Sequence, residues 1–439
     1  MLNDHKIAVF SNVSFENHGN QSLRNFIEGF LLKGYKVILI TIDLNYNSEH
    51  VRKFVAENPG LKIINPLFTG QEKALIYSAS TNKAAIKTRL KAMLRYRKGF
   101  SNSEINQWFS IVSYIFVMWK MICFIKANRE MMNSFERLIF IDVYGGVLAK
   151  TIKAWCPELW KKIYPDTAAY YLGTVLKQFK GNSSAFFAMP ISFFGSYKLP
   201  VPRIIITDDG TDGEKVFRTR MFYKGRILFL RNGIDERLMT FENSNSDYSS
   251  AKYEFVTCSR LTRWKRVDRA IQFIAAIKRK STFPLHLTII GEGNERPILE
   301  NLAKEEGVSE DVSFIGGMEY NKALQCISTH KYYIVFNDLS NLGNQIYEAI
   351  CLGLVPVTID DGSTDSILQH GKNAMKFPLS DSFADKAADM FLQIQSEDRL
   401  PAIFANVEIT KELLFTWRQR NKMEQDFLSL TCDNHGFGG

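Results

Sequence analysis

Short apolar runs alternate with amphipathic stretches along most of the chain. The first such unit has an apolar run over residues 6–12, a polar loop that contains glycine, a helical stretch that ends at Leu32, and a second apolar run over residues 35–43. Gly34 supplies the stop signal between the helix and the second run. This order predicts a β-α-β unit with parallel strands. Further strands are expected over residues 61–66, 137–144, 203–207 and 226–232.

The same pattern restarts after residues 242–252, a polar stretch that we interpret as a linker. The strands expected in this second part are apolar throughout, as in sheets that are covered by helices on both faces. The sequence therefore predicts an α/β protein with two successive doubly wound domains. The second set of expected strands covers residues 253–260, 285–293, 311–317, 332–338 and 354–362.

One N-terminal segment departs from this alternation. Residues 73–103 contain no acidic side chain, and residues 108–125 form an apolar, aromatic-rich run interrupted by Lys120. One interpretation is a solvated basic helix followed by a core helix. The other is a basic amphipathic helix beside an apolar one, which together bind anionic lipid at a membrane surface. A true membrane span is disfavoured, because the run is at the short limit and holds a lysine. The basic residues concerned are Lys83, Lys87, Arg89, Lys91, Arg95, Arg97 and Lys98.

The composition is that of a globular protein. Of 439 residues, 46% are hydrophobic and 23% are charged, which excludes a mostly disordered or collagen-like chain. The formal net charge of +9 favours an anionic partner without identifying it. The six cysteines form no CxxC pair and indicate reduced thiols of a cytoplasmic protein. The first residues lack the features of a secretory signal.

The first candidate site contains two cations at the end of an expected strand. Arg260 ends the strand over residues 253–260, and Lys265 follows just before a helix. Carboxyl ends of strands face the ligand crevice of doubly wound sheets, and a cation pair there suits a phosphate ester leaving group. Solvated loop cations are the alternative. Gly291 and Gly293 lie on a later strand-to-helix turn, where a tight turn explains the glycines equally well.

A second candidate site lies between the strand over residues 332–338 and a helix that begins near Gly343. Its loop presents backbone N–H groups and the positive end of a helix dipole, which together favour an anion. Glu348 lies inside that helix among apolar neighbours, so its carboxylate must be paired or hydrogen-bonded, and sugar hydroxyls would satisfy it. The loop residues are Ser340, Asn341, Leu342 and Gly343.

The order of SRLTRWK, GEG, VSFIGG and EAICLGLVPV resembles the GT4 family of retaining GT-B glycosyltransferases. FLRNGID resembles that family's Asn-Gly-x-Asp signature near the domain junction, and FTWRQRNKMEQDF resembles its closing Trp-containing helix. The resemblance implies the GT-B fold, an α/β architecture of two Rossmann-like doubly wound domains that face each other across a cleft. The domains expected are residues 1–235 on the acceptor side, with an insertion at about 73–128, residues 236–405 for the nucleotide-sugar, and residues 406–439 as a helix that crosses back.

The resemblance also implies roles for individual residues. Arg260 and Lys265 would hold the donor diphosphate, with Gly291 in the donor site, and Glu348 matches the ribose-binding second glutamate of the Glu-x7-Glu motif. The first glutamate of that motif falls on Ser340, so either sugar recognition is altered or Asp338 replaces it. The loop at residues 340–343 resembles a less usual branch of GT4-like sequences. Two stretches with no assigned role, DDGTDG (208–213) and IDDGST (359–364), resemble the same branch.

In the N-terminal half, His18 and Gly19 lie where the family has a glycine-containing loop near the donor phosphates and the acceptor. A lone loop histidine such as His18 is more often a surface or capping residue. The family commonly places a histidine after a later strand, here the one over residues 137–144, but the sequence has none there. Asp142 stands at that strand end instead, either as a polar site residue or as a cap of the next helix.

The implied activity is retaining transfer of a hexose from a UDP- or GDP-linked sugar to a saccharide or polyprenyl-linked acceptor, in cell-surface glycan assembly. No residues with metal-ligand spacing stand out, so we expect neither a metal nor another cofactor. We expect peripheral attachment to the inner face of the membrane. The alternatives are a GT-B epimerase or phosphorylase, or a non-catalytic partner subunit in which Ser340 marks lost chemistry. A nucleic-acid binder rests on charge alone and is not expected.

Overall fold

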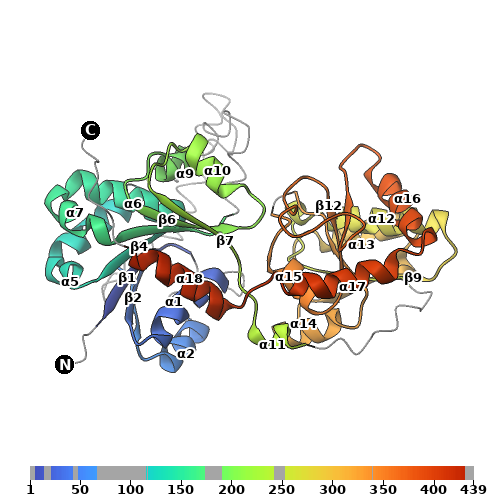
Figure 1. Cartoon of the computed structure of the whole chain (residues 1–439), viewed down its shortest axis with the longest axis horizontal. Coiled ribbons are helices and arrows are strands. Elements are labelled where there is room, and N and C mark those ends of the chain that lie inside the picture. Colours follow the sequence, from blue (N-terminus) through green and yellow to red (C-terminus); the bar gives the residue numbers. More distant parts are fainter. Residues whose placement is uncertain are drawn as a thin grey trace, which may run out of the picture. The chain divides into compact units, whose positions relative to one another are not determined.

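The computed structural model describes residues 5–13, 21–42, 48–66, 115, 117–173, 190–241, 253–338 and 340–430. These residues form two compact units, each built around one sheet (Figure 1). The first unit takes its described residues from 1–207, 214–230 and 421–439, and the second takes them from 208–213 and 231–420. Residues 208–213, which the sequence placed in the N-terminal domain, therefore pack with the second unit.

The sheet of the first unit has seven strands in the order β3-β2-β1-β4-β5-β6-β7. The pairs from β3 to β6 are parallel, and Ala8 lies opposite both Ile38 and Leu138. Every strand predicted here is present, whereas β5 was missed because its TAAYY sequence holds two alanines, which favour strands weakly. The strands are β1 (Lys6–Ser11), β2 (Lys36–Thr41), β3 (Leu61–Ile64), β4 (Arg137–Ile141), β5 (Thr167–Tyr171), β6 (Arg203–Asp208) and β7 (Arg226–Arg231).

Helices cover both faces of this sheet, which explains why its strands are apolar at successive positions. Ile7 and Val9 of β1 pack in one hydrophobic cluster, and Ala8 and Phe10 pack in another. The first cluster includes side chains of α1 (Gln21–Leu32), α2 (Glu49–Glu57) and α18 (Trp417–Ser429). The second includes side chains of α5 (Arg129–Asn133), α6 (Asp142–Trp155), α7 (Pro157–Ile163), α9 (Pro190–Ser196) and α10 (Gly213–Thr219).

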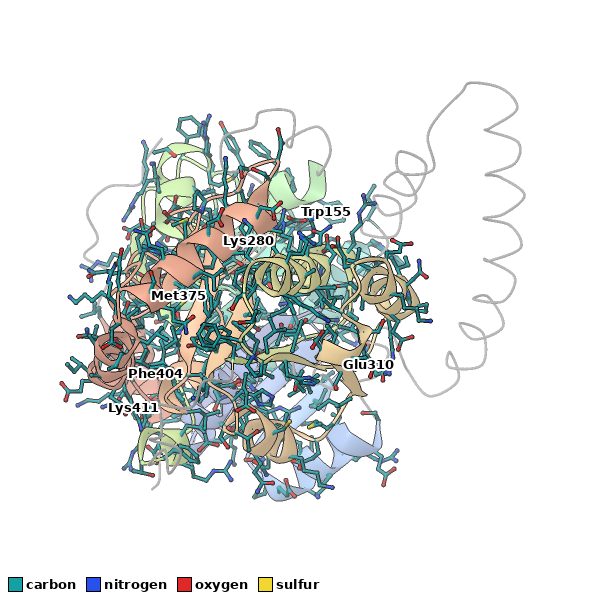
Figure 2. All side chains as sticks on the ribbon, turned by 90° about the vertical axis from the view of Figure 1, so that its right-hand side faces the viewer. Trp155, Lys280, Glu310, Met375, Phe404 and Lys411 are labelled. Atoms are coloured by element: carbon teal, nitrogen blue, oxygen red, sulfur yellow. The ribbon has the colours of Figure 1, made fainter. Side chains whose placement is uncertain are left out.

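The sheet of the second unit has six strands in the order β10-β9-β8-β11-β12-β13, all parallel to their neighbours. Each predicted strand is present, and only the three-residue β13 was missed. Met375 and Phe404 lie inside this unit, whereas Glu310 is exposed (Figure 2). The strands are β8 (Tyr253–Cys258), β9 (Leu285–Ile290), β10 (Val312–Gly316), β11 (Tyr332–Val335), β12 (Val355–Ile359) and β13 (Met375–Phe377). The helices are α11 (Glu236–Met239), α12 (Val267–Lys280), α13 (Arg296–Glu305), α14 (Tyr320–Ile327), α15 (Asn344–Cys351), α16 (Phe383–Ser396) and α17 (Leu400–Lys411).

The strand order creates a topological switch point in the second sheet. From β8 the chain proceeds to β9 and β10 on one side, and it then returns to place β11 on the other side of β8. The loops that follow β8 and β11 therefore diverge at the carboxyl edge of adjacent strands, where doubly wound sheets bind ligands. Both candidate sites predicted from the sequence, at Arg260 and at residues 340–343, follow these strands.

The N-terminal insertion is described only in its last part. Residues 117–127 are helical, and Met118, Met121 and Ile122 are buried in the core of the first unit. The basic segment over residues 83–98 lies outside the described residues. Within the described part of the chain, no helix combines the length and the hydropathy that a membrane crossing requires.

Candidate functional site

Two glycines bring the loop after β9 against the loop that carries Arg260. A Cβ on Gly291 would lie 1.9 Å from the carbonyl oxygen of Ser259, and one on Gly293 would lie 2.1 Å from that of Leu261. Gly291 also has a φ of +136°, a conformation that side chains rarely allow. The Leu261 amide donates to the carbonyl oxygen of Glu292 at 2.9 Å. The glycine pair thus fixes the position of the Arg260 loop, a role that the sequence left open.

Arg260 and Lys265 lie close to each other in that loop. Arg260 is exposed, and Lys265 ends a 3-10 turn (Arg263–Lys265) with its Nζ 4.2 Å from the ring centroid of Trp264. Burial and the neighbouring Arg260 lower the pKa of Lys265 to about 8. Neither cation forms an ion pair with an acidic side chain in the part of the chain that the structure describes. Two adjacent cations without a carboxylate favour an anionic ligand.

Asp338, one of the two alternatives that the sequence left for the missing glutamate, forms ion pairs with two arginines. Its Oδ1 lies 3.2 Å from Nη1 of Arg266 and 2.9 Å from Nη2 of Arg269. Its backbone amide donates to the carbonyl oxygen of Trp264 at 2.9 Å, which ties the loop after β11 to the loop after β8. Asp338 therefore has a clear structural role at the start of α12.

In the loop before α15, the Ser340 side chain contacts a neighbouring loop, whereas Asn341 and Leu342 are buried. Ser340 has a left-handed backbone (φ +58°), and its hydroxyl donates to Oδ2 of Asp209 at 2.9 Å. Asn341 donates to the carbonyl oxygen of Asn337 at 3.1 Å. Leu342 is a core side chain, so a ligand would meet only its backbone. Gly343 precedes α15 without a side-chain cap, and a Cβ there would meet nothing nearer than 3.9 Å, so the helix N-terminus is accessible.

Glu348 has the hydrogen-bonded partner that its position requires. The Tyr320 hydroxyl on α14 donates to its Oε1 at 2.8 Å. Burial raises the pKa of Glu348, and the bond from Tyr320 opposes that rise. A further hydroxyl donor, such as a ribose, would stabilise the ionised carboxylate. Sequence reasoning predicted the need for a partner but did not find Tyr320, since 28 residues separate the two.

A partly buried polar network that sequence reasoning missed holds the first residue of α15. Asn232 donates to Oδ1 of Asn344 at 2.6 Å and accepts from Nη1 of Arg420 at the same distance. Arg420 also donates to the carbonyl oxygen of Arg231 at 2.7 Å. Gly233 allows the close approach, because a Cβ there would lie 2.6 Å from the backbone of Trp417. The FLRNGID segment thus joins the N-terminus of α15 to the start of α18.

In the first unit, Asp142 begins α6 with a left-handed backbone (φ +51°). Its Oδ1 accepts from the backbone amide of Leu172 at 2.8 Å, so it links the ends of β4 and β5. The N-cap residue of α6 is Ile141, whose side chain forms no capping bond. His18 and Gly19 lie outside the described residues.

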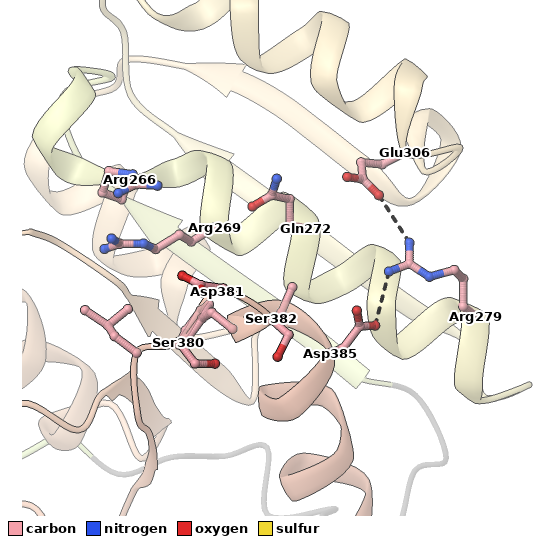
Figure 3. Close-up of a pocket in the computed structure, with 12 residues that line it drawn as sticks. Arg266, Arg269, Gln272, Arg279, Glu306, Ser380, Asp381, Ser382 and Asp385 are labelled. Atoms are coloured by element: carbon pink, nitrogen blue, oxygen red, sulfur yellow. Dashed lines mark hydrogen bonds and ion pairs between the residues drawn. The ribbon is translucent and has the colours of Figure 1, made fainter.

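A polar pocket lies beside α12, between that helix and the loop before α16 (Figure 3). Its arginines are already paired: Arg279 bridges Glu306 at 3.2 Å and Asp385 at 3.4 Å. Arg266 and Arg269 contact Asp338 as described above. Because these charges are satisfied, the pocket offers less to an anion than the Arg260 loop does. Across the described ranges, no three His, Cys, Asp or Glu side chains are grouped so as to hold a metal ion.

The fold follows from the two sheets and from the comparisons with solved structures. HepE from Anabaena, solved with UDP and glucose, has a TM-score of 0.64 at 12% identity over 97% of this chain and 99% of that one. Sucrose-phosphate synthase from Thermosynechococcus elongatus has a TM-score of 0.63 at 14% identity over 96% and 98%. WaaG, a glycosyltransferase involved in lipopolysaccharide biosynthesis, has a TM-score of 0.61 at 12% identity over 96% and 99%. The predicted GT-B fold is confirmed.

The family match lies in the second unit. Residues 241–403 match the family model described as "Glycosyl transferases group 1". The chain thus has the GT-B fold, and the match in its second unit supports the predicted resemblance to GT4-like glycosyltransferases. No curated protein sequence matches the chain significantly. The matched region includes Arg260, Lys265, Gly291, the loop at residues 340–343 and Glu348.

Proposed function

We propose that the protein is a GT4 enzyme that transfers a hexose from a nucleotide-sugar, with retention, to a saccharide or lipid-linked acceptor in cell-surface glycan assembly. The observation that carries this proposal is the cation pair Arg260 and Lys265 at the switch point of the unit that matches the group 1 glycosyltransferase family model. UDP is the first candidate nucleotide, because HepE was solved with UDP and glucose. GDP is the second.

The proposed mechanism is mainly electrostatic. Negative charge develops on the departing diphosphate as the sugar gains oxocarbenium character. Arg260, Lys265 and the N-terminus of α15 at Gly343 stabilise that charge. Glu348, oriented by Tyr320, accepts hydrogen bonds from the ribose. We propose that these cations serve in place of a divalent ion.

Nucleotide binding tests the proposal directly. A thermal-shift screen of the full chain with UDP, GDP, ADP and CMP, and with their sugars, is expected to find one nucleotide that stabilises the fold. At 100-fold excess over Kd, binding adds about 2.7 kcal/mol to the free energy of unfolding. The Lys265→Ala variant should lose most of that shift. A chain that none of these compounds stabilises would refute a nucleotide-sugar site.

We further propose that the enzyme attaches peripherally to the inner face of the membrane. The helix over residues 117–127 buries one side in the core, as described above. Ile115 and Trp119 are 65% and 48% exposed, and Cys123 is exposed four residues further along. This spacing places the three on one helical face. The basic segment over residues 83–98 precedes this face and would attract anionic headgroups.

Vesicle sedimentation tests the attachment. Wild-type protein should sediment with vesicles that contain anionic lipid, and salt should release it in part. The change of Lys87, Lys91, Arg95 and Lys98 to Glu should abolish sedimentation, since each cation near the surface contributes about 1 kcal/mol. The matched control changes Arg52, Lys53, Lys161 and Lys162 to Glu, which gives the same net charge and should leave sedimentation intact. Wild-type protein that stays in the supernatant with every vesicle would contradict the proposal.

A further inference from the structure

The loop over residues 208–213 forms a polar contact zone with the loops after β11 and β12. It leaves the end of β6, and its Asp209 accepts a hydrogen bond from Ser340 at 2.9 Å. Gly210 has a φ of +83°, and a Cβ there would lie 2.5 Å from the carbonyl oxygen of Ser363. The two acidic, glycine-containing motifs at residues 208–213 and 359–364 therefore meet beside Ser340.

Several buried polar atoms in and beside this zone lack a partner among the described residues. Each belongs to a side chain that is at least nine-tenths buried, and a buried polar atom without a hydrogen bond is unfavourable. The Tyr347 hydroxyl is near the acidic loop: burial raises its pKa most, and Asp208 and Asp209 raise it further. The four atoms are Asn341 Oδ1, Tyr347 Oη, Ser363 Oγ and Thr364 Oγ1.

The chemistry of this zone fits sugar hydroxyls. Hydroxyl, amide oxygen and carboxylate groups together donate and accept hydrogen bonds, as each sugar hydroxyl also does. A phosphate would be repelled by Asp209 and finds its cations at Arg260 and Lys265 instead. The carboxylate of Asp208 is balanced by Arg231 and Arg420: burial raises its pKa, and both arginines lower it.

The position of the zone agrees with a nucleotide-sugar donor that reaches from the cations Arg260 and Lys265 to the zone beside Ser340. Gly343 is the N-cap residue of α15, and Ser340 lies three residues before it. A diphosphate bound to that N-terminus and to Arg260 would direct its attached sugar towards the neighbouring loop. Asp338, the other carboxylate nearby, is committed to Arg266 and Arg269.

We propose that Asp209 binds a hydroxyl of the transferred sugar and that Ser340 positions its carboxylate. The loop over residues 208–213 is then the sugar-recognising element of the donor site. This inference rests on the proposed function, because it assigns one part of a nucleotide-sugar to this zone.

The test separates binding of the sugar from binding of the nucleotide. Calorimetry on the full chain gives the Kd of UDP, UDP-glucose, UDP-N-acetylglucosamine, GDP and GDP-mannose. Asp209→Asn should weaken the preferred nucleotide-sugar about tenfold or more and change the Kd of its nucleoside diphosphate less than about twofold. Asp338→Asn, the matched control, should produce no such selective loss. Equal weakening of both ligands by Asp209→Asn, or no weakening, would overturn the proposal.

A second variant covers the case in which Asp209→Asn does not fold. Ser340→Gly tolerates the left-handed backbone and removes the hydroxymethyl side chain that donates to Asp209. It should weaken the nucleotide-sugar severalfold, again without an effect on the nucleoside diphosphate. Nucleotide-sugar binding equal to wild type in Ser340→Gly would overturn the role of this pair. Wild-type protein that binds no nucleoside diphosphate would refute the proposed function itself, a result distinct from a loss of sugar selectivity.

Discussion

Replacement of Arg260 or Lys265 by alanine is expected to lower turnover of the sugar donor about 100-fold or more, with the fold intact. Each cation would stabilise charge that develops on the leaving diphosphate, and loss of one such group typically costs about 2.7 to 4 kcal/mol in the transition state. Steady-state kinetics and thermal unfolding measure the two quantities separately. Arg263→Ala is the matched control, since Arg263 is an exposed cation of the same turn and should be dispensable. Wild-type turnover in both site variants would refute the assigned donor site.

The lowered pKa of Lys265 adds a pH dependence to the same prediction. In the free protein this amine is half charged at about pH 8, and a bound diphosphate would hold it charged. Affinity for the diphosphate should therefore be constant below about pH 8 and fall above it by up to about tenfold per pH unit. Lys265→Arg, which stays charged, should remove the decline. A Kd that does not change between pH 7 and 9 in wild type would show that Lys265 does not bind the anion.

Gly291→Ala is expected to destabilise the second unit by about 3 kcal/mol or more. The new methyl group would lie 1.9 Å from the carbonyl oxygen of Ser259, and the φ of +136° adds backbone strain. Because Ser259 directly precedes Arg260, any variant that folds should also bind the diphosphate more weakly. Chemical denaturation and calorimetry measure these effects.

Gly307→Ala separates the two causes of the stability loss in Gly291→Ala, which are the steric clash with Ser259 and the strained backbone. Gly307 also has a positive φ, of +71°, but a Cβ there would meet nothing within 4 Å. Its replacement should cost only about 1 kcal/mol, from the left-handed backbone alone. An equal cost at both positions would show that the close approach to Ser259 contributes nothing.

The fold could be predicted well because its signals are local. Strands buried on both faces must be apolar at successive positions, and helices between them must be amphipathic, so the alternation is visible in the sequence. The two strands that were missed are short or rich in alanine, and their burial comes from neighbouring elements. The strand order depends on pairing between distant segments, and only the structure shows it.

The candidate site could be predicted only where a motif is continuous. Arg260, Lys265 and residues 340–343 could be proposed as candidates because strand ends and helix starts are local features. Tyr320 and Arg420 were missed because nothing near them in the chain indicates their partners, Glu348 and Asn232.

By itself the sequence determined the two α/β domains, the loops at the strand ends and the cations that suit a diphosphate. The tertiary structure decided how those loops meet. It committed Asp338 to two arginines, and it placed Asp209, which is 131 residues away in the chain, against Ser340. The physical reason is that hydrogen bonds and close packing depend on distance in space. In a fold with crossover connections, the separation of two segments along the chain does not tell whether they lie close together.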